Sequence, residues 1–504
     1  MKYTKFIAIL FTVILVFVSS CEKNLDVTNP NQPTEAQFWE TKDDAKKAIT
    51  AAYAKTQMQV WGGAWGAAEH WFVTQHVRSD LAGYSPGIGG TFRAAYLYNT
   101  PNTKYWLSNY WESMYQGVYA SNQVIENVKN MDIDKEARNK YIGEAKFLRA
   151  YYHFHLLINF KNIPLITETP EERADYYKSP VEREKVWSKI ENDLADAKSV
   201  LPNNWESKSL GRATKGSATA LLGKAYLYQR KWSKAESQFK DVVNMGEYGL
   251  VDNVETLFNG SNEYSKESIF EINYTQKTTG GRTETNSFPP QLSEEGWLTI
   301  YANDYIKNLY KNDTSSSGEI SSRALASTVF NHKKSDVWYF PEEAEENKTK
   351  YETYFGTNEN RAFWKKYCYY DQGDMAIWQS GANYMVIRYS DVLLMLAEAL
   401  NEQGKTSEAI NYVNKVRNRA GVVPVENMSQ GELREHIRHV ERPLELGGEY
   451  MRFHDLVRWY KDDIGKLKQI LREHGREKAA GNFSREDLYY PIPESEVNTN
   501  PNYE

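Results

Sequence analysis

Apolar residues recur at helical spacing along much of the chain. Windows of this kind lie near 106–130, 135–159, 184–201 and 430–460, and in each the apolar positions fall on one face of a helix. Such a face has to be buried against another element to be shielded from water. The pattern therefore predicts an all-α protein built from packed amphipathic helices.

Two stretches follow the spacing of the tetratricopeptide repeat. The first consists of Leu222–Tyr226, Ala235 and Phe239, and the second of Leu396, Ala397, Leu400, Ala409 and Val413. A small residue such as Gly223 or Ala397 lets the first helix of the pair approach the second closely. One helix hairpin cannot bury its apolar face alone, so we expect further helices to stack on each pair.

The repeats are separated by a segment of different character. Residues 250–385 have no sustained helical period and include short strand-like pieces such as Ser268–Tyr274, while a shorter Gly-rich loop lies at Gly83–Gly90. Recognition residues are commonly carried by irregular segments on a rigid frame. We expect a helical-repeat scaffold at about 40–250 and 386–504, with the intervening insert binding the ligand.

The N-terminus has the features of an export signal. An apolar run, Phe6–Val18, follows two lysines and is too short to span a bilayer comfortably. Val18–Cys21 then has the bacterial lipobox order of apolar, small, small, Cys. We predict a lipoprotein signal peptide at 1–20 and a lipid on Cys21; the alternative is an ordinary signal peptide that happens to end beside a cysteine.

Composition narrows the class of protein. The chain has 41% hydrophobic and 25% charged residues and a net charge of −6, so it lacks the basic surplus of a nucleic-acid-binding protein. Its second cysteine, Cys368, has no partner once Cys21 carries lipid, which excludes an intrachain disulfide. The 36 Tyr and 14 Trp are many for such a composition, and these side chains serve in both cores and contact surfaces.

Five further blocks follow the lipobox along the chain. They are Ala145–Ile166, Lys215–Ala235, Arg388–Gly421, Glu441–Trp459 and Tyr490–Tyr503. In content and order the blocks resemble the SusD/RagB family of outer-membrane nutrient-binding lipoproteins of Bacteroidetes. The resemblance spans nearly the whole chain after Cys21. It implies a SusD-like fold, in which a tetratricopeptide-based scaffold carries an irregular half.

The resemblance also implies a function and a partner. Members capture oligosaccharides, or in some cases peptides, and sit as a lid over a TonB-dependent, SusC-like transporter barrel in the outer membrane. No reaction and no cofactor are implied. The lipid would anchor the protein at the cell surface, although the acidic run common after the cysteine of surface-exposed members is absent, since Lys23 follows Glu22.

Charged residues within the blocks stand among apolar helical positions. They are Arg149, Arg388, Asp391, Glu398, Arg442 and Glu445. A charge in such surroundings is costly unless it is paired. We therefore expect ion pairs between helices and no catalytic role.

Sugar binding calls for another combination of residues. Exposed Trp or Tyr rings pack against the apolar C–H face of a sugar, and Asp, Asn or Arg bond its hydroxyl groups. One candidate group near the Gly-rich loop consists of Asp80, Tyr84, Arg93 and Tyr96. The other, in the insert, consists of Trp297, Tyr301, Asn303, Trp338, Tyr339 and Trp378. Each of these rings could instead belong to the core.

Motifs of the common enzyme classes are absent. The chain has no HExxH, P-loop or GxSxG sequence, and the His436-x-x-His439 spacing lacks an obvious third metal ligand. We predict neither catalysis nor a bound metal. Three alternatives to oligosaccharide capture stay open. They are a peptide-capturing member of the same family, a glycan-cleaving enzyme with two carboxylates brought together by the fold, and a scaffold that binds only protein.

Overall fold

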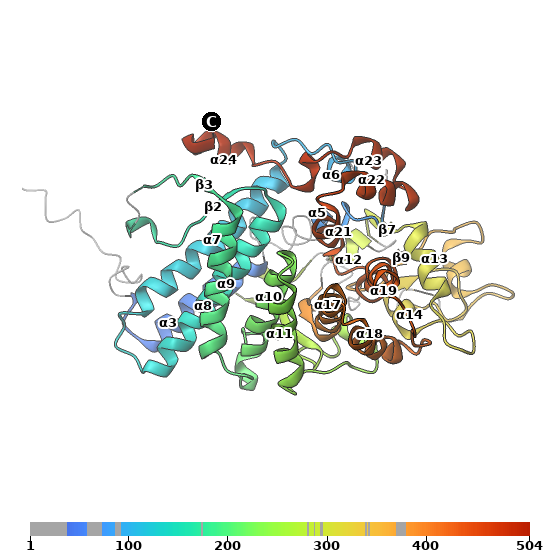
Figure 1. The fold of residues 1–504 in the computed structure, drawn as a ribbon, viewed down its shortest axis with the longest axis horizontal. Helices are drawn as coiled ribbons and strands as arrows, with labels where there is room; N and C mark the ends of the chain where they lie inside the picture. The colour runs from blue at the N-terminus through green and yellow to red at the C-terminus, as the bar shows by residue number, and fades with distance from the viewer. Residues whose placement is uncertain are drawn as a thin grey trace, which may run out of the picture.

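The computed structural model describes residues 38–57, 73–85, 92–172, 175–279, 282–286, 288–292, 296–337, 340, 343–368 and 380–503. The predicted signal peptide and Cys21 lie outside this part of the chain, as do Trp338, Tyr339 and Trp378. Helices dominate, and the strands are short and paired in twos (Figure 1). None of the described helices is long and apolar enough to cross a bilayer.

The long helices form a continuous row. They are α3 (Lys42–Ala54), α7 (Tyr105–Val128), α8 (Lys135–Asn159), α9 (Arg183–Val200), α10 (Lys215–Tyr228), α11 (Trp232–Asn244), α17 (Tyr389–Glu402) and α18 (Thr406–Ala420). From α7 to α11 each helix packs on the next, and α11 packs directly on α17 although residues 245–388 separate them in sequence (Figure 1). The predicted all-α scaffold of tetratricopeptide type is confirmed.

The α10–α11 hairpin illustrates why the repeat spacing matters. A Cβ atom at Gly223 would lie 2.6 Å from the Phe239 ring, so only glycine permits this approach of the two helices. The helix α10 begins at a capping box in which the Thr214 and Ser217 side chains accept hydrogen bonds from each other's backbone N–H. Local sequence thus determines both the start of the helix and its packing distance.

The single helical stretch expected near 430–460 is interrupted. It consists of α19 (Gln430–His436), a π turn (Ile437–Glu441), α20 (Arg442–Leu446) and α21 (Arg452–Tyr460). Gly448, at φ +82°, and Tyr450, at φ +71°, turn the chain between α20 and α21. All nine residues of α21 and four of the five residues of α20 are buried, so apolar positions recur on both sides of the turn and the sequence pattern does not reveal the break.

Shorter elements complete the fold. The helices are α5 (Val73–His76), α6 (Arg93–Tyr96), α12 (Phe288–Leu292), α13 (Asp304–Asn312), α14 (Ser322–Ser327), α15 (Lys350–Phe355), α22 (Ile464–Glu473), α23 (Glu477–Asn482) and α24 (Glu494–Thr499). The strands are β1 (Ala82–Tyr84), β2 (Ile163–Pro164), β3 (Pro180–Val181), β4 (Ser268–Ile272), β5 (Thr275–Thr279), β6 (Arg282–Glu284), β7 (Ile300–Ala302), β8 (Thr328–Val329), β9 (Phe363–Trp364) and β10 (Tyr384–Arg388). Two antiparallel pairs join distant segments, β1 with β7 and β4 with β10.

The charged residues of the sequence blocks are buried in ion pairs, as predicted. Arg149 pairs with Asp193 at 2.8 Å, Arg442 with Asp391 at 2.9 Å, and Glu398 with Arg458 at 2.7 Å. The guanidinium of Arg388 donates to Glu267 at 2.8 Å, to Glu445 at 2.6 Å and to Glu449 at 2.7 Å. These residues belong to the frame of the protein.

Candidate functional site

An open pocket of about 710 Å³ lies where β1 and β7 meet α13 and the α22–α23 turn. We call it the Tyr301 pocket. Its rings are Tyr96, Tyr301 and Tyr305, and its polar side chains are Asn303, Asp304, Asn308, Asn312, Asn358, Glu359, Asn360, Arg361, Glu473, His474 and Arg476. The volume falls within the range of small-molecule pockets, and the mixture of rings and amides suits a hydroxyl-rich ligand.

Tyr301 owes its position to the β1–β7 pair. Gly83 stands opposite Tyr301 in this antiparallel ladder, and a Cβ atom on Gly83 would lie 2.2 Å from the tyrosine ring. The missing side chain therefore lets the ring lie across the strand. The guanidinium carbon of Arg361 lies 5.8 Å from the ring centroid, and Glu359 holds this arginine at 2.7 Å.

Tyr96 and Tyr84, from the region beside the Gly-rich loop, lie at the Tyr301 pocket. Their rings stack with centroids 5.3 Å apart and planes 27° apart, and the guanidinium of Arg476 lies 4.2 Å from the Tyr96 centroid. Tyr96 lines the pocket and Tyr84 supports it from behind. The two candidate groups of the sequence thus contribute rings to one pocket, Tyr96 from the first and Tyr301 from the second.

Asp80 does not reach this pocket. Its side chain is fully buried, its two oxygens each accept a hydrogen bond of 2.8 Å from Arg452, and one also contacts His474 Nδ1 at 2.8 Å. Burial would raise its pKa, but the charge of Arg452 and the hydrogen bonds from Arg452 and His474 hold that pKa well below the usual range. The ligand contact expected of Asp80 is therefore incompatible with its place behind the pocket wall.

Through His474, Asp80 still affects the pocket surface. The His474 ring stacks on Tyr305 with centroids 3.4 Å apart and planes 11° apart, and both residues line the pocket. The Asn303 amide group is likewise used in hydrogen bonds within the protein, since it donates to the carbonyl oxygens of Asp80 at 2.7 Å and His474 at 3.0 Å. Its Oδ1 caps α13 by accepting the Ile306 N–H at 3.2 Å.

Two further candidates lie elsewhere. Arg93 is exposed at the start of α6, Trp297 is half-buried, and neither lines the Tyr301 pocket. Tyr305, Asn308 and Asn312 also line the pocket but are not among the residues predicted from the sequence, although a signal is present. These three residues recur at helical spacing as one polar stripe of α13, opposite buried Ile306 and Tyr310.

Two of the three carboxylates that line the pocket are paired with cations, and the third, Glu473, accepts a hydrogen bond from Gln469 at 2.7 Å. Asp304 pairs with Lys307 at 2.5 Å, and Glu359 pairs with Arg361. The hydrogen bond from Arg361 lowers the pKa of Glu359, whereas a glycosidase acid needs a raised pKa to keep its proton. The arrangement therefore favours binding over proton transfer at Glu359.

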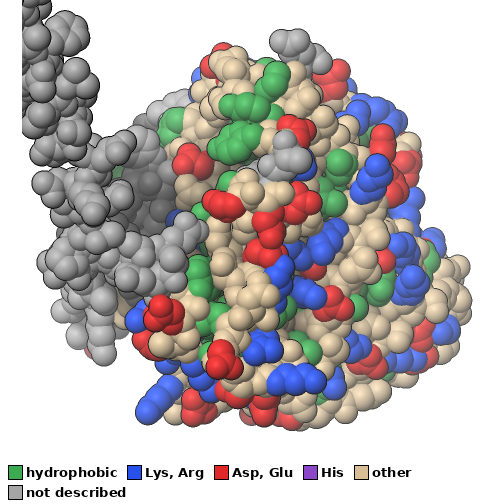
Figure 2. Space-filling model, turned by 90° about the vertical axis from the view of Figure 1, so that its left-hand side faces the viewer, with side chains coloured by type: hydrophobic (Ala, Val, Ile, Leu, Met, Phe, Trp, Pro, Cys, Tyr) green, Lys and Arg blue, Asp and Glu red, His purple; other side chains and the backbone are tan. Residues whose placement is uncertain are grey.

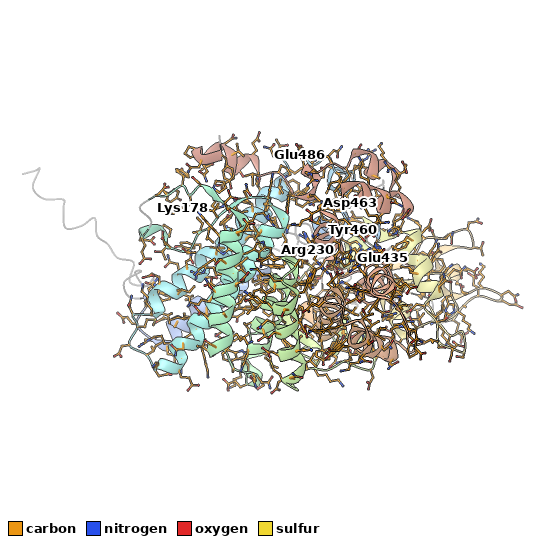
Figure 3. All side chains as sticks on the ribbon, in the orientation of Figure 1. Lys178, Arg230, Glu435, Tyr460, Asp463 and Glu486 are labelled. Atoms are coloured by element: carbon orange, nitrogen blue, oxygen red, sulfur yellow. The ribbon has the colours of Figure 1, made fainter. Side chains whose placement is uncertain are left out.

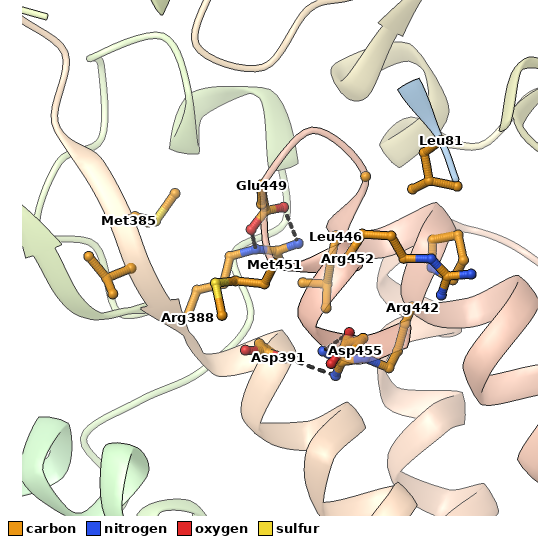
Figure 4. Close-up of a pocket in the computed structure, with 13 residues that line it drawn as sticks. Leu81, Met385, Arg388, Asp391, Arg442, Leu446, Glu449, Met451, Arg452 and Asp455 are labelled. Carbon is orange, nitrogen blue, oxygen red and sulfur yellow. Dashed lines mark hydrogen bonds and ion pairs between the residues drawn. The ribbon is translucent and has the colours of Figure 1, made fainter. Parts of the chain in front are cut away.

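A second, much smaller cavity is lined mainly by ion-paired charges (Figure 4). It measures about 30 Å³ and lies among the ion pairs of Arg388 with Glu449, and of Arg442 with Asp391 and Asp455. That volume holds about one water molecule and no sugar ring. These charges bind one another, so the cavity belongs to the frame.

Comparison with known proteins agrees with the fold and the sequence blocks. Family models match residues 266–504, described as the SusD family, and 25–227, described as starch-binding associating with outer membrane. A SusD-like protein of Formosa agariphila is 27% identical over 543 aligned residues, covering 100% of this chain and 98% of the relative.

Solved structures agree over the same length. A SusD superfamily protein from Bacteroides vulgatus has a TM-score of 0.79 at 24% identity, covering 92% of this chain and 98% of that chain. A laminarin-binding SusD-like protein has a TM-score of 0.71 at 26% identity, covering 91% and 97%. Since the matches include both the repeat scaffold and the insert, the chain belongs to the SusD/RagB family.

Proposed function

We propose that this protein captures oligosaccharides in the Tyr301 pocket without cleaving them. The supporting observation is the pocket itself, in which the rings of Tyr96 and Tyr301 lie beside the amides of α13 in an open cavity of about 710 Å³. A sugar packs its C–H face on such rings, and amide and guanidinium groups bond its hydroxyls. The laminarin-binding relative supports a carbohydrate ligand for this fold.

We further infer that the captured sugar passes to a TonB-dependent, SusC-like transporter, with the lipid on Cys21 tethering the protein to the outer membrane at the cell surface. The lipobox Val18–Cys21 supports the tether, and the description of the matched family, associating with outer membrane, supports the location. A lipid anchor with two or more chains binds a membrane stably while leaving the folded domain free to swing.

The test is affinity electrophoresis of the mature protein in gels containing laminarin, starch, xylan or galactomannan. We expect retardation by at least one polysaccharide, and its loss in Tyr301→Ala. The matched control is Tyr412→Ala, which truncates a half-buried tyrosine on α18 that lines neither this pocket nor its surroundings.

Three outcomes would contradict the proposal. Retention on no polysaccharide together with binding of peptides would favour the peptide-capturing alternative. Binding that is unchanged in Tyr301→Ala would place the sugar elsewhere. Release of reducing ends that is abolished by Glu359→Gln or Asp304→Asn would favour a glycan-cleaving enzyme.

A further inference from the structure

Exposed hydrophobic side chains gather on one side of the molecule. Of the eight large ones among the described residues, five belong to α7, to the β2–β3 connection or to α24. They are Tyr105, Tyr119, Tyr176, Tyr177 and Val497. Figure 2 looks onto this side and shows hydrophobic side chains collected in its upper part. Single exposed rings are ordinary, but a cluster of them marks a contact surface.

Most of the cluster surrounds a groove of about 680 Å³, which we call the α7 groove. Its rings are Trp111, Tyr115, Tyr119, Tyr176 and Tyr177. It shares no lining residue with the Tyr301 pocket. The two cavities are therefore separate.

One wall of the groove is a face of α7 with two parallel rows. Trp111, Tyr115 and Tyr119 follow one another every four residues, and so do Ser108, Glu112 and Gln116 beside them. Trp111 is buried at the floor, its centroid 4.9 Å from that of Tyr115, and Tyr119 is 46% exposed at the mouth. A row of rings thus runs next to a row of hydrogen-bonding groups.

The opposite wall is held in place by the C-terminal segment. Tyr176 and Tyr177 are 65% and 37% exposed, with ring centroids 5.1 Å apart. Asn502 donates to the carbonyl oxygen of Tyr177 at 2.7 Å, and Asn500 donates to that of Lys178 at 3.1 Å. Lys178, labelled in Figure 3, lies next to β3. These bonds fix the backbone that carries the exposed rings, which lowers the entropy cost of binding.

We propose that the α7 groove is a second carbohydrate-binding site, which takes a segment of a polysaccharide independently of the Tyr301 pocket. The groove combines rings with hydroxyl, amide and carboxylate groups, the same chemistry as that pocket. Its aliphatic lining is confined to Pro164 and Ile166, so its apolar surface consists mainly of flat rings that fit sugar faces. A polymer held at both sites dissociates more slowly than from either alone.

The test is hydroxyl-radical footprinting of the full mature protein with laminarin, starch, xylan or galactomannan. Peptides that carry Tyr119 and Tyr176–Tyr177 report on the α7 groove, and those that carry Tyr96 and Tyr301 report separately on the Tyr301 pocket. We expect at least one polysaccharide to lower oxidation of the α7-groove peptides twofold or more. The peptide that carries Tyr412, which lines neither cavity, serves as the internal control.

A double variant, Tyr119→Ala with Tyr176→Ala, sharpens the result. Both side chains are exposed, so the fold should survive, and we expect severalfold weaker retention on the same polysaccharide with protection at Tyr301 unchanged. Unchanged oxidation of the α7-groove peptides with every polysaccharide would overturn the second site, whatever happens at Tyr301. Protection of these peptides only by an added transporter barrel would also overturn it, in favour of a protein-docking surface.

Discussion

The charges around Arg388 and the rings of the Tyr301 pocket are held in contrasting ways. Arg388 is almost completely buried and donates to three carboxylates, and Arg419, Arg388 and Arg323 overcome the effect of burial to lower the pKa of Glu445 to about 2. In the pocket, Tyr96 and Tyr301 are only partly covered. The contrast separates residues that maintain the fold from residues that are available to a ligand.

Removing Arg388 should cause the largest loss, because this residue stabilises the scaffold. In Arg388→Met the carboxylates of Glu267, Glu445 and Glu449 would lose a buried cationic partner, and such losses cost about 3–5 kcal/mol of unfolding free energy. Urea denaturation monitored by circular dichroism would measure it. Arg361→Met, which removes a partly exposed arginine of the pocket, is the control with an expected loss below about 1 kcal/mol. Equal losses in the two variants would erase the proposed distinction.

Acid should weaken the scaffold through buried His153. Burial first, and then the nearby Arg149, lowers its pKa to about 3, so between pH 3 and its ordinary 6.5 the unfolded chain binds a proton that the folded chain does not. The unfolding free energy should therefore fall as pH falls below about 6.5, by about 2 kcal/mol at pH 5 from this group.

Urea midpoints at pH 7 and pH 5 would test this contribution. His153→Gln removes the titrating group. The fall in unfolding free energy from pH 7 to pH 5 should therefore be about 2 kcal/mol smaller in this variant than in the unsubstituted protein. An identical pH dependence in both proteins would show that His153 does not contribute.

Truncating Tyr96 should instead weaken ligand binding. Tyr96→Ala removes a ring that Tyr84 and Arg476 hold in the pocket wall, and we expect about tenfold weaker oligosaccharide binding, or about 1.4 kcal/mol. Isothermal titration with an oligosaccharide of the retained polysaccharide would measure the affinity. The Tyr96→Ala variant should lose less unfolding free energy than the Arg388→Met variant. The reverse order, with folding lost and binding kept, would count against the assignment of Tyr96 to the ligand.

The smallest expected effect comes from Gly83→Ala. The added methyl group would meet the Tyr301 ring at 2.2 Å, so the ring has to move, and we expect roughly fivefold weaker binding, or about 1 kcal/mol. Gly481→Ala adds the same methyl group where nothing lies within 4 Å and should leave the affinity unchanged. Equal affinities in both variants would show that the placement of Tyr301 by Gly83 is unimportant.

The sequence predicted the parts of this molecule that depend on local spacing. The α10–α11 hairpin follows from Gly223 and Phe239, and the burial of Arg388 in ion pairs follows from its apolar neighbours. The pocket was harder to predict because it requires β1 to pair with β7, far along the chain. The pairing of Asp80 could not be predicted either, because its partner Arg452 lies 372 residues away and nothing local reveals the pair.

The direct packing of α11 on α17 has a consequence for how specificity can change. The chain leaves this pair of helices and returns along the antiparallel strands β4 and β10, so the segment between them is inserted at a single point of the frame. One wall of the Tyr301 pocket, with Tyr301 and Asn308, belongs to that insertion, while Tyr96 and Arg476 come from outside it. Related chains could therefore exchange the inserted segment as a unit and acquire a new ligand while retaining the same repeat frame.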